Sequence, residues 1–152
     1  AEGRLVLADV LAYVNKNYHP KAIVDFATLT GEVLVALGNR ASGVMGNNDT
    51  LMKEVKKASE TTGEKVWELP LWKEYQSSIK GKYADIQNMG EARLAGTISA
   101  GVFLKEFVGN TPWVHMDIAG TAWGPKEPSY QPKVGATGVA VRMMYQFLES
   151  RI

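Results

Sequence analysis

Two side chains at the start of the chain could do chemistry together. Glu2 and Arg4 lie two residues apart, at the beginning of a segment with helical periodicity. Unpaired backbone N–H groups and the helix dipole favour anions at a helix N-terminus. A carboxylate there can serve as a metal ligand, and a guanidinium can hold a carboxylate-like anion through two parallel hydrogen bonds. The alternative is that Glu2 only balances the helix dipole and that Arg4 is solvated.

Three further polar residues interrupt apolar segments. His115 and Asp117 are two residues apart in the segment 113–119, so on a strand they share one face of the sheet. They could bind a metal, but no third ligand has a recognisable spacing, which favours a hydrogen-bonded buried pair. Asp25 interrupts the segment 21–27 and must have a hydrogen-bonding or ionic partner or stay protonated, because an isolated buried charge is costly. We favour structural anchoring for Asp25.

Helical and extended segments alternate along the chain. Short apolar segments predict strands at 21–27, 41–46 and 113–119. Apolar residues spaced by three and four predict helices over about 5–15 and 95–107, and further helices after Asn48, Pro70 and Thr137. A threonine before Glu32 is expected to cap a short helix over 32–37. The segments 80–94 and 120–135 have neither period and are predicted to be irregular loops.

Three strands that alternate with about five helices predict an α/β fold with a mostly parallel sheet and helices on both faces. In such sheets, ligands bind beyond the carboxyl ends of the strands. Three places fit that description: the start of the chain around Glu2 and Arg4, the turn 28–31 and the turn 119–122. These places form the candidate site.

Composition excludes several classes of protein. The 152 residues contain 17 basic and 16 acidic side chains, so the formal charge of +1 gives no broad field for nucleic acid or an anionic membrane. Cysteine is absent, which excludes disulfides and thiolate metal sites. No apolar run reaches about 18 residues and no secretion signal opens the chain, so a cytoplasmic protein is expected. Because the chain starts at Ala1 without Met, we expect a processed or truncated piece of a longer protein.

Several motifs, taken together, resemble the leucyl (cytosol) aminopeptidase family in order and spacing. They are AEGRL (1–5), ATLTG (27–31), AD (84–85) with NMG (88–90), WVHMDIAGTAW (113–123) and GATG (135–138). The family's first motif is Asn-Thr-Asp-Ala-Glu-Gly-Arg-Leu, and this chain begins at its fourth position. The resemblance implies that residues 1–152 are the C-terminal part of the catalytic domain. The N-terminal domain and the upstream segment with the other metal ligands are then absent.

The resemblance also implies roles for individual residues. Glu2 matches a glutamate that bridges two divalent metal ions, for which Mn²⁺, Zn²⁺ and Mg²⁺ are candidates. Arg4 matches a catalytic arginine that holds bicarbonate, the general base for the attacking water. The residues that match substrate-binding positions are Thr28, Leu29, Gly31, Ala119 and Ala122. The small side chain of Ala122 should leave a roomy pocket for the N-terminal side chain of the substrate.

The implied activity is that of a metal-dependent aminopeptidase, which releases N-terminal, leucine-like residues from peptides by means of a water activated by two metals. The resemblance further implies a homohexamer. One retained ligand cannot hold two ions, so the chain alone is expected to be inactive. The alternative is a non-catalytic assembly or binding domain that keeps the fold. Ala119 and Ala122 would form an alanine-lined wall of the pocket. The enzyme interpretation requires that Glu2 and Arg4 do not both point into solvent, away from the turn 28–31 and this wall.

Overall fold

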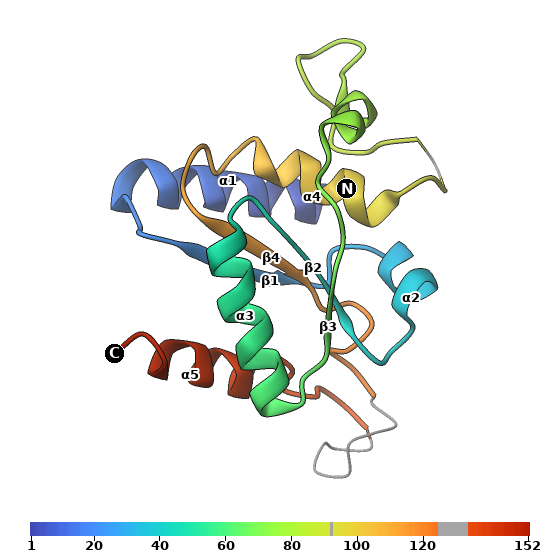
Figure 1. The fold of residues 1–152 in the computed structure, drawn as a ribbon. Coiled ribbons are helices and arrows are strands. Elements are labelled where there is room, and N and C mark those ends of the chain that lie inside the picture. The colour runs from blue at the N-terminus through green and yellow to red at the C-terminus, as the bar shows by residue number, and fades with distance from the viewer. Residues whose placement is uncertain (92, 125–133) are drawn as a thin grey trace.

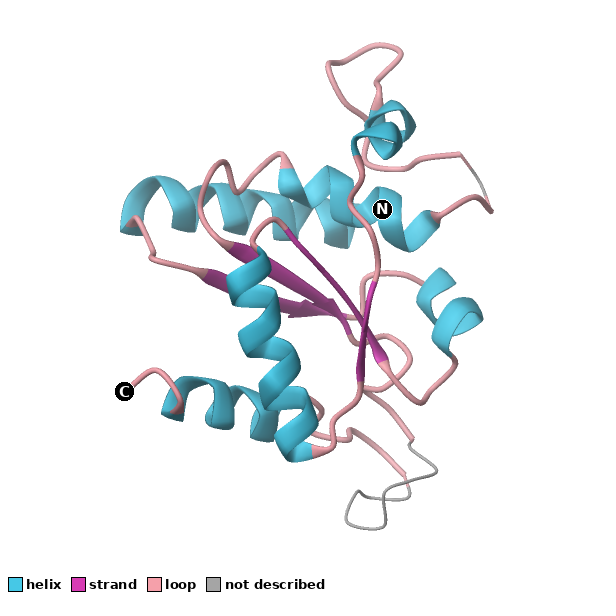
Figure 2. Ribbon diagram, viewed as in Figure 1, coloured by secondary structure: helices cyan, strands magenta, loops and turns pink. Residues whose placement is uncertain are grey.

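The computed structural model describes residues 1–91, 93–124 and 134–152, which form a central sheet with helices on both faces (Figure 1). Figure 2 shows how the helices and strands alternate along the chain. The elements are α1 (Glu2–Tyr18), β1 (Ile23–Ala27), α2 (Glu32–Leu37), β2 (Ser42–Gly46), α3 (Asp49–Thr62), β3 (Val66–Glu68), the 3-10 helix η1 (Lys73–Ile79), α4 (Gly96–Lys105), β4 (Trp113–Asp117) and α5 (Val141–Glu149). The predicted α/β class is confirmed. Most of the predicted irregular segment 120–135 lies outside the described residues.

The sheet is mixed, with the strand order β1-β4-β2-β3. β1 runs parallel to β4 and β2 runs parallel to β3, but the central pair β2 and β4 is antiparallel. The sequence predicts three strands and misses β3, which has only three residues and is too short to show a period of two. In the β1 and β4 pair, Ile23 lies opposite Trp113 and Ala27 lies opposite Asp117. The carboxyl ends of β1 and β4 therefore meet at one edge of the sheet.

Each face of the sheet has its own apolar core. Val114 and Met116 pack with residues of α3 and α5, whereas Ile23 and Trp113 pack with residues of α1 and α4. Figure 1 shows these two helix pairs on opposite sides of the sheet. Close packing of α4 depends on its small residues, because a Cβ at Gly101 would lie 2.6 Å from the sulfur of Met45 on β2. The alternation of side chains along β1 and β4 places Asp25, His115 and Asp117 on the α1 and α4 side.

Several helix ends follow local rules. α1 extends beyond the predicted 5–15 at both ends and stops at His19, which has a φ of 45° and precedes Pro20. α3 begins at Asn48, whose side chain accepts a hydrogen bond from the Leu51 amide at 2.9 Å. The predicted threonine cap of α2 is confirmed in its hydrogen bond, because the Thr30 hydroxyl accepts from the Val33 amide at 3.3 Å, although Gly31 is the residue directly before the helix. Among the described residues, no helix has the length and apolar character needed to cross a bilayer.

Candidate active site

Two turns meet at the carboxyl edge of the β1 and β4 pair. Residues 28–31 follow β1, and residues 118–122 follow β4. The Ile118 amide donates a hydrogen bond to the Ala27 carbonyl at 2.9 Å, which continues the strand pairing into both turns. α1, α2 and α4 all begin on this side of the sheet (Figure 1). The structure therefore brings together the two predicted substrate-binding segments, at the edge where α/β proteins bind ligands.

Asp117 joins the two turns. Its carboxylate is fully buried, and one oxygen accepts hydrogen bonds from the amides of Leu29 at 3.0 Å and Ala119 at 3.1 Å. The other oxygen accepts a hydrogen bond from the Thr30 hydroxyl at 2.6 Å. Thr30 in turn pairs with the Thr97 hydroxyl of α4 at 2.8 Å. One side chain thus connects β4, the turn after β1 and the first turn of α4.

The alanine-lined wall, formed by Ala119 and Ala122, is also held by hydrogen bonds within and next to the turn 118–122. The amides of Thr121 and Ala122 donate to the Ile118 carbonyl at 3.0 and 2.9 Å, which closes a tight turn. The Thr121 hydroxyl pairs with Ser42 at 2.6 Å. Glycine is required within this turn, because a Cβ at Gly120 would lie 2.3 Å from a backbone carbonyl oxygen of residue 38. Ala119 and Ala122 are therefore held on a rigid support.

Arg4 points toward this edge. Its side chain is 9% exposed and donates a hydrogen bond from Nη1 to the Asn88 carbonyl, and no described residue hydrogen-bonds its buried Nε. Burial lowers the pKa of the Arg4 guanidinium, and the neighbouring carboxylates of Glu32 and Asp117 act in the opposite direction. An arginine stays protonated in proteins, so the group presents a positive charge, and its buried Nε donor has no partner among the described residues. A positive charge with a free donor can attract a small anion.

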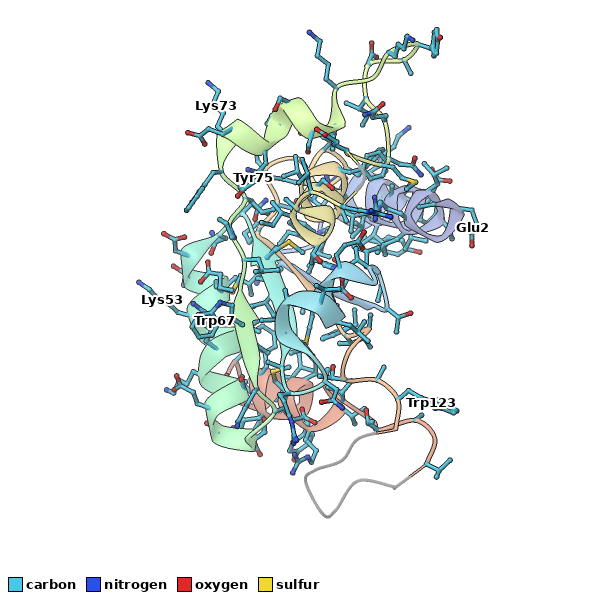
Figure 3. The ribbon with its side chains drawn as sticks, turned by 90° about the vertical axis from the view of Figure 1, so that its right-hand side faces the viewer. Glu2, Lys53, Trp67, Lys73, Tyr75 and Trp123 are labelled. Atoms are coloured by element: carbon cyan, nitrogen blue, oxygen red, sulfur yellow. The ribbon has the colours of Figure 1, made fainter. Side chains whose placement is uncertain are left out.

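Glu2 lies elsewhere. Its residue is exposed, and Figure 3 shows its side chain at the start of α1, directed away from the body of the molecule. The reason is geometric: residues two apart on an α-helix are separated by about 200° around its axis. Since Arg4 points inward, Glu2 must point outward. The structure does not bring these two residues into one hollow, and the metal role of Glu2 stays a prediction.

The described ranges do not by themselves form a metal centre. Within them, no group of three or more His, Cys, Asp or Glu side chains is arranged to hold a metal ion. Glu2 offers one carboxylate, and divalent ions in oxygen-rich sites need several ligands. A metal site that includes Glu2 would need ligands from outside the described residues.

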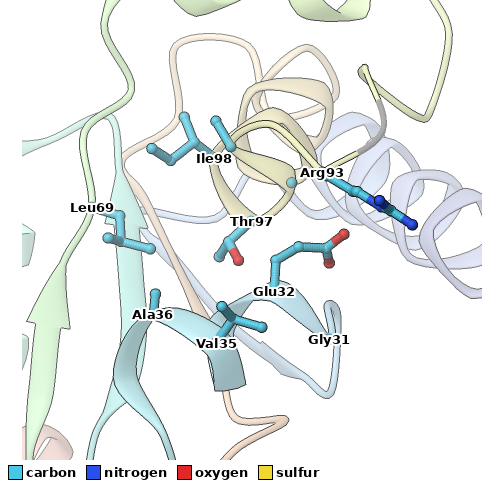
Figure 4. A pocket seen from close by; sticks show the side chains of 10 residues that line it. Gly31, Glu32, Val35, Ala36, Leu69, Arg93, Thr97 and Ile98 are labelled. Atoms are coloured by element: carbon cyan, nitrogen blue, oxygen red, sulfur yellow. The ribbon is translucent and has the colours of Figure 1, made fainter.

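A cavity of about 630 Å³ adjoins the turn after β1 (Figure 4). Its lining residues are Gly31, Glu32, Val35, Ala36, Leu69, Arg93, Ala95, Gly96, Thr97 and Ile98. Glu32 packs against the start of α4, since a Cβ at Gly96 would lie 2.6 Å from its carboxyl carbon. Of the predicted substrate-binding residues, Gly31 lines this cavity, whereas Thr28, Leu29, Ala119 and Ala122 do not.

Asp25 and His115 form a separate polar cluster in the middle of the same sheet face. Asp25 accepts a hydrogen bond from the Trp113 indole at 2.6 Å and lies 2.6 Å from His115 Nδ1. The expected partner of Asp25 is therefore confirmed, as is the shared burial of His115 and Asp117. Among the described residues, His115 and Asp117 do not hydrogen-bond to each other. His115 pairs with Asp25, and Asp117 accepts hydrogen bonds from the two turns.

The hydrogen-bonded set of Asp117, Thr30 and Thr97 is what sequence reasoning missed. The signal available in the sequence was an acid at the end of an apolar strand, directly before the Ile-Ala-Gly of residues 118–120. A strand acid followed by a glycine turn is typical of a residue that binds the amides of that turn. Nothing local pointed to Thr97, which is 67 residues away from Thr30 in sequence.

The fold and the site define an α/β domain with a candidate binding edge beyond β1 and β4. The profile described as "Cytosol aminopeptidase family, catalytic domain" matches residues 1–145, so the chain belongs to this family.

Similar proteins include three named "Probable cytosol aminopeptidase". They come from Cenarchaeum symbiosum (52% identical over 154 residues), Geobacter sulfurreducens (52% over 152 residues) and Roseiflexus castenholzii (53% over 149 residues). The alignments cover 97 to 100% of this chain but only 30 or 31% of those relatives. The chain thus spans about a third of their length.

Proposed function

We propose that this chain is the C-terminal part of the catalytic domain of a metal-dependent aminopeptidase, which releases N-terminal, leucine-like residues from peptides. The family assignment supports the reaction class. The single structural observation that carries the proposal is the junction at Asp117, where the two predicted substrate-binding turns lie together beside Arg4. The relatives are about three times as long as the match, which leaves room for an N-terminal domain and for further metal ligands.

The chain's own residues would bind and orient the substrate. Thr28, Leu29 and Gly31 would contact the peptide near its free amine, and Ala119 and Ala122 would form the wall of the pocket for its first side chain. Arg4 would hold bicarbonate through its unused Nε donor, so that the anion can take a proton from the attacking water. The rigid support of the alanine wall favours a fixed pocket shape, which a specific exopeptidase needs.

Glu2 would be this chain's contribution to the metal centre of the complete enzyme. Two divalent ions, with Mn²⁺, Zn²⁺ and Mg²⁺ as candidates, would there polarise the scissile carbonyl and lower the pKa of the attacking water. Because one carboxylate cannot hold two ions, the 152-residue chain alone is expected to show no measurable turnover. We also propose a cytoplasmic homohexamer for the complete enzyme. A non-catalytic assembly or binding domain is the second candidate, supported by the exposed position of Glu2.

The test is turnover of leucine p-nitroanilide with added Mn²⁺ by the full-length protein that contains this sequence, after its intact mass has been measured. Glu2→Ala should lower kcat/KM by about 100-fold or more, because a metal ligand is lost. Asp9→Ala is the matched control, since Asp9 is another exposed acid of α1, and it should retain the wild-type rate.

Near-normal turnover of Glu2→Ala would contradict the metal role of Glu2 and leave the peptidase proposal standing. No turnover by the wild-type full-length protein would remove the peptidase proposal and favour the assembly domain.

A further inference from the structure

Asp117 differs from the other buried polar groups of the chain in what it connects. The Asp25 cluster lies within the strands, and Glu64 serves one helix end. Asp117 instead binds donors from both proposed substrate-binding turns, with distances of 2.6 to 3.1 Å to Leu29, Thr30 and Ala119. Two of those donors belong to residues that we propose to contact the substrate.

The chemistry of Asp117 suits a side chain that holds the two turns in place, which we call the Asp117 hub, and not a group that reacts with a substrate. Asp117 is fully buried, and its carboxylate oxygens are the acceptors in all three of its hydrogen bonds. Charge-assisted hydrogen bonds are stronger than neutral ones, and a buried carboxylate that loses its donors carries a large desolvation cost. The two turns therefore cannot move apart without breaking these bonds. Through Thr30, the same constraint reaches Thr97 on α4.

We propose that Asp117 is a positioning residue for substrate specificity: it fixes the distance between the turn 28–31 and the alanine wall. This inference rests on the proposed function, because it is through substrate binding that the distance matters. A pocket with two walls set by one side chain discriminates among substrates by shape, and small displacements of a wall change the fit of bulky side chains most. Loss of the hub should therefore raise KM for bulky substrates more than it lowers kcat.

The kinetic experiment compares two substitutions at Thr30 in the full-length protein. Thr30→Val is nearly isosteric but cannot donate to Asp117, and it also loses the pairing with Thr97 and the bond from the Val33 amide, whereas Thr30→Ser keeps the hydroxyl and all three bonds. We expect Thr30→Val to raise KM for leucine p-nitroanilide by about tenfold, in line with the loss of one charge-assisted hydrogen bond, and kcat to change by less than about threefold. The ratio of kcat/KM for leucine over alanine substrates should fall, and Thr30→Ser should restore both values.

Thr61→Val is the matched control. The Thr61 hydroxyl bonds only to the Lys57 carbonyl of its own helix in the described structure, at 3.0 Å, and far from the site. An unchanged KM and an unchanged leucine to alanine ratio in Thr30→Val, with only a lower melting temperature, would show a purely structural role and overturn the proposal. Equal losses in Thr30→Ser and Thr30→Val would overturn it as well.

A second measurement is independent of activity. Hydrogen exchange of the full-length protein should become faster in peptides that cover 27–31 and 118–122 when Asp117 is replaced by Ala, and both turns should change together. Faster exchange in only one turn, or in neither, would overturn the hub. If the wild-type protein has no turnover while both turns respond, the proposed function fails and the specificity role of Asp117 falls with it, whereas the physical coupling stands.

Discussion

Arg4 shows how the chemistry of one residue depends on its surroundings. A guanidinium at a helix start is ordinarily solvated, and that was one of the two interpretations left open by the sequence. Here the side chain is buried, with its Nη1 on the Asn88 carbonyl and two carboxylates near it. The interpretation of Arg4 as a solvated side chain is wrong. Its proposed role in holding bicarbonate remains a prediction.

Replacing Arg4 tests that role directly. Arg4→Lys keeps the charge but removes the planar donor set, so it should lower kcat/KM by about tenfold or more and raise the bicarbonate concentration needed for half-maximal rate. The measurement is the rate of the full-length protein over a bicarbonate titration. Arg151→Lys, in an exposed ion pair with Glu54, serves as the control. The same bicarbonate dependence in wild type and Arg4→Lys would rule out an anion site at Arg4.

Ala122 tests the pocket wall. Its turn is held by hydrogen bonds to Ile118 and by the pairing of Thr121 with Ser42, so a larger side chain at 122 should not displace the wall. Ala122→Met should therefore fill the pocket and lower kcat/KM for leucine substrates relative to alanine substrates by about tenfold. Steady-state kinetics on both substrates measures the ratio. A ratio equal to that of wild type would place the pocket somewhere else.

At the scale of elements, the carboxyl ends of β1 and β4 and the first turns of three helices supply the site. Parallel pairing of β1 with β4 brings the two turns together, and α4 can approach β2 closely because Gly101 has no side chain. The last helix depends on a partner from elsewhere in the chain. The buried carboxylate of Glu64 accepts a hydrogen bond from the Met143 amide, near the start of α5, at 3.0 Å. Glu64 thus takes the place of a capping side chain, since the N-cap residue Ala140 provides none.

Glu64→Ala should loosen α5. It leaves a buried helix amide without its acceptor, which should lower the local free energy of opening by about 1 to 3 kcal/mol. Hydrogen exchange across residues 141–149 of the full-length protein measures this change. Glu64→Gln keeps an acceptor oxygen and should lose less, and Glu60→Ala, at an exposed position of α3, should lose nothing. Unchanged exchange in Glu64→Ala would mean that α5 is held by apolar packing alone.

At the scale of the whole molecule, the two cores leave aromatic side chains uncovered. Trp67 and Trp72 are each 64% exposed and line a cavity of about 580 Å³ with Pro70 and Lys56. Large aromatic side chains ordinarily lie in a core or at an interface between subunits. Neither tryptophan lies in a core: Trp67 is on the outer face of the edge strand β3, and Trp72 lies in the segment between β3 and η1. Large exposed apolar residues that lie close together often mark an interface with another subunit.

If the complete enzyme is a hexamer, its assembly can show whether the surface around Trp67 and Trp72 is a subunit interface. Replacing both Trp67 and Trp72 by Ser should shift the full-length protein toward smaller species if these side chains are buried between subunits. Light scattering after size-exclusion chromatography over a concentration series measures the mass. Tyr83→Ser is the control, because Tyr83 is 93% exposed and lies on a different loop. An unchanged mass at every concentration would show that the tryptophan surface is not an interface.

Much of this molecule could be derived from local patterns. Apolar spacing located α1, α3, α4, β1, β2 and β4, because those patterns depend on neighbours within about four residues. The order of the motifs identified the family, and the family assignment confirms it. The strand β3 was missed, because its three residues are too few to carry a signal.

Only the tertiary structure decided how the site is assembled. The antiparallel pairing of β2 with β4, the inward side chain of Arg4 beside an outward Glu2, and the hub at Asp117 all depend on contacts between distant segments. Asp117 and Leu29 are 88 residues apart in sequence, so no local pattern can pair them. The sequence therefore determined which elements form and which family they belong to. Packing of the helices onto the two faces of the sheet decided which polar side chains meet, because burial leaves a carboxylate stable only where donors surround it.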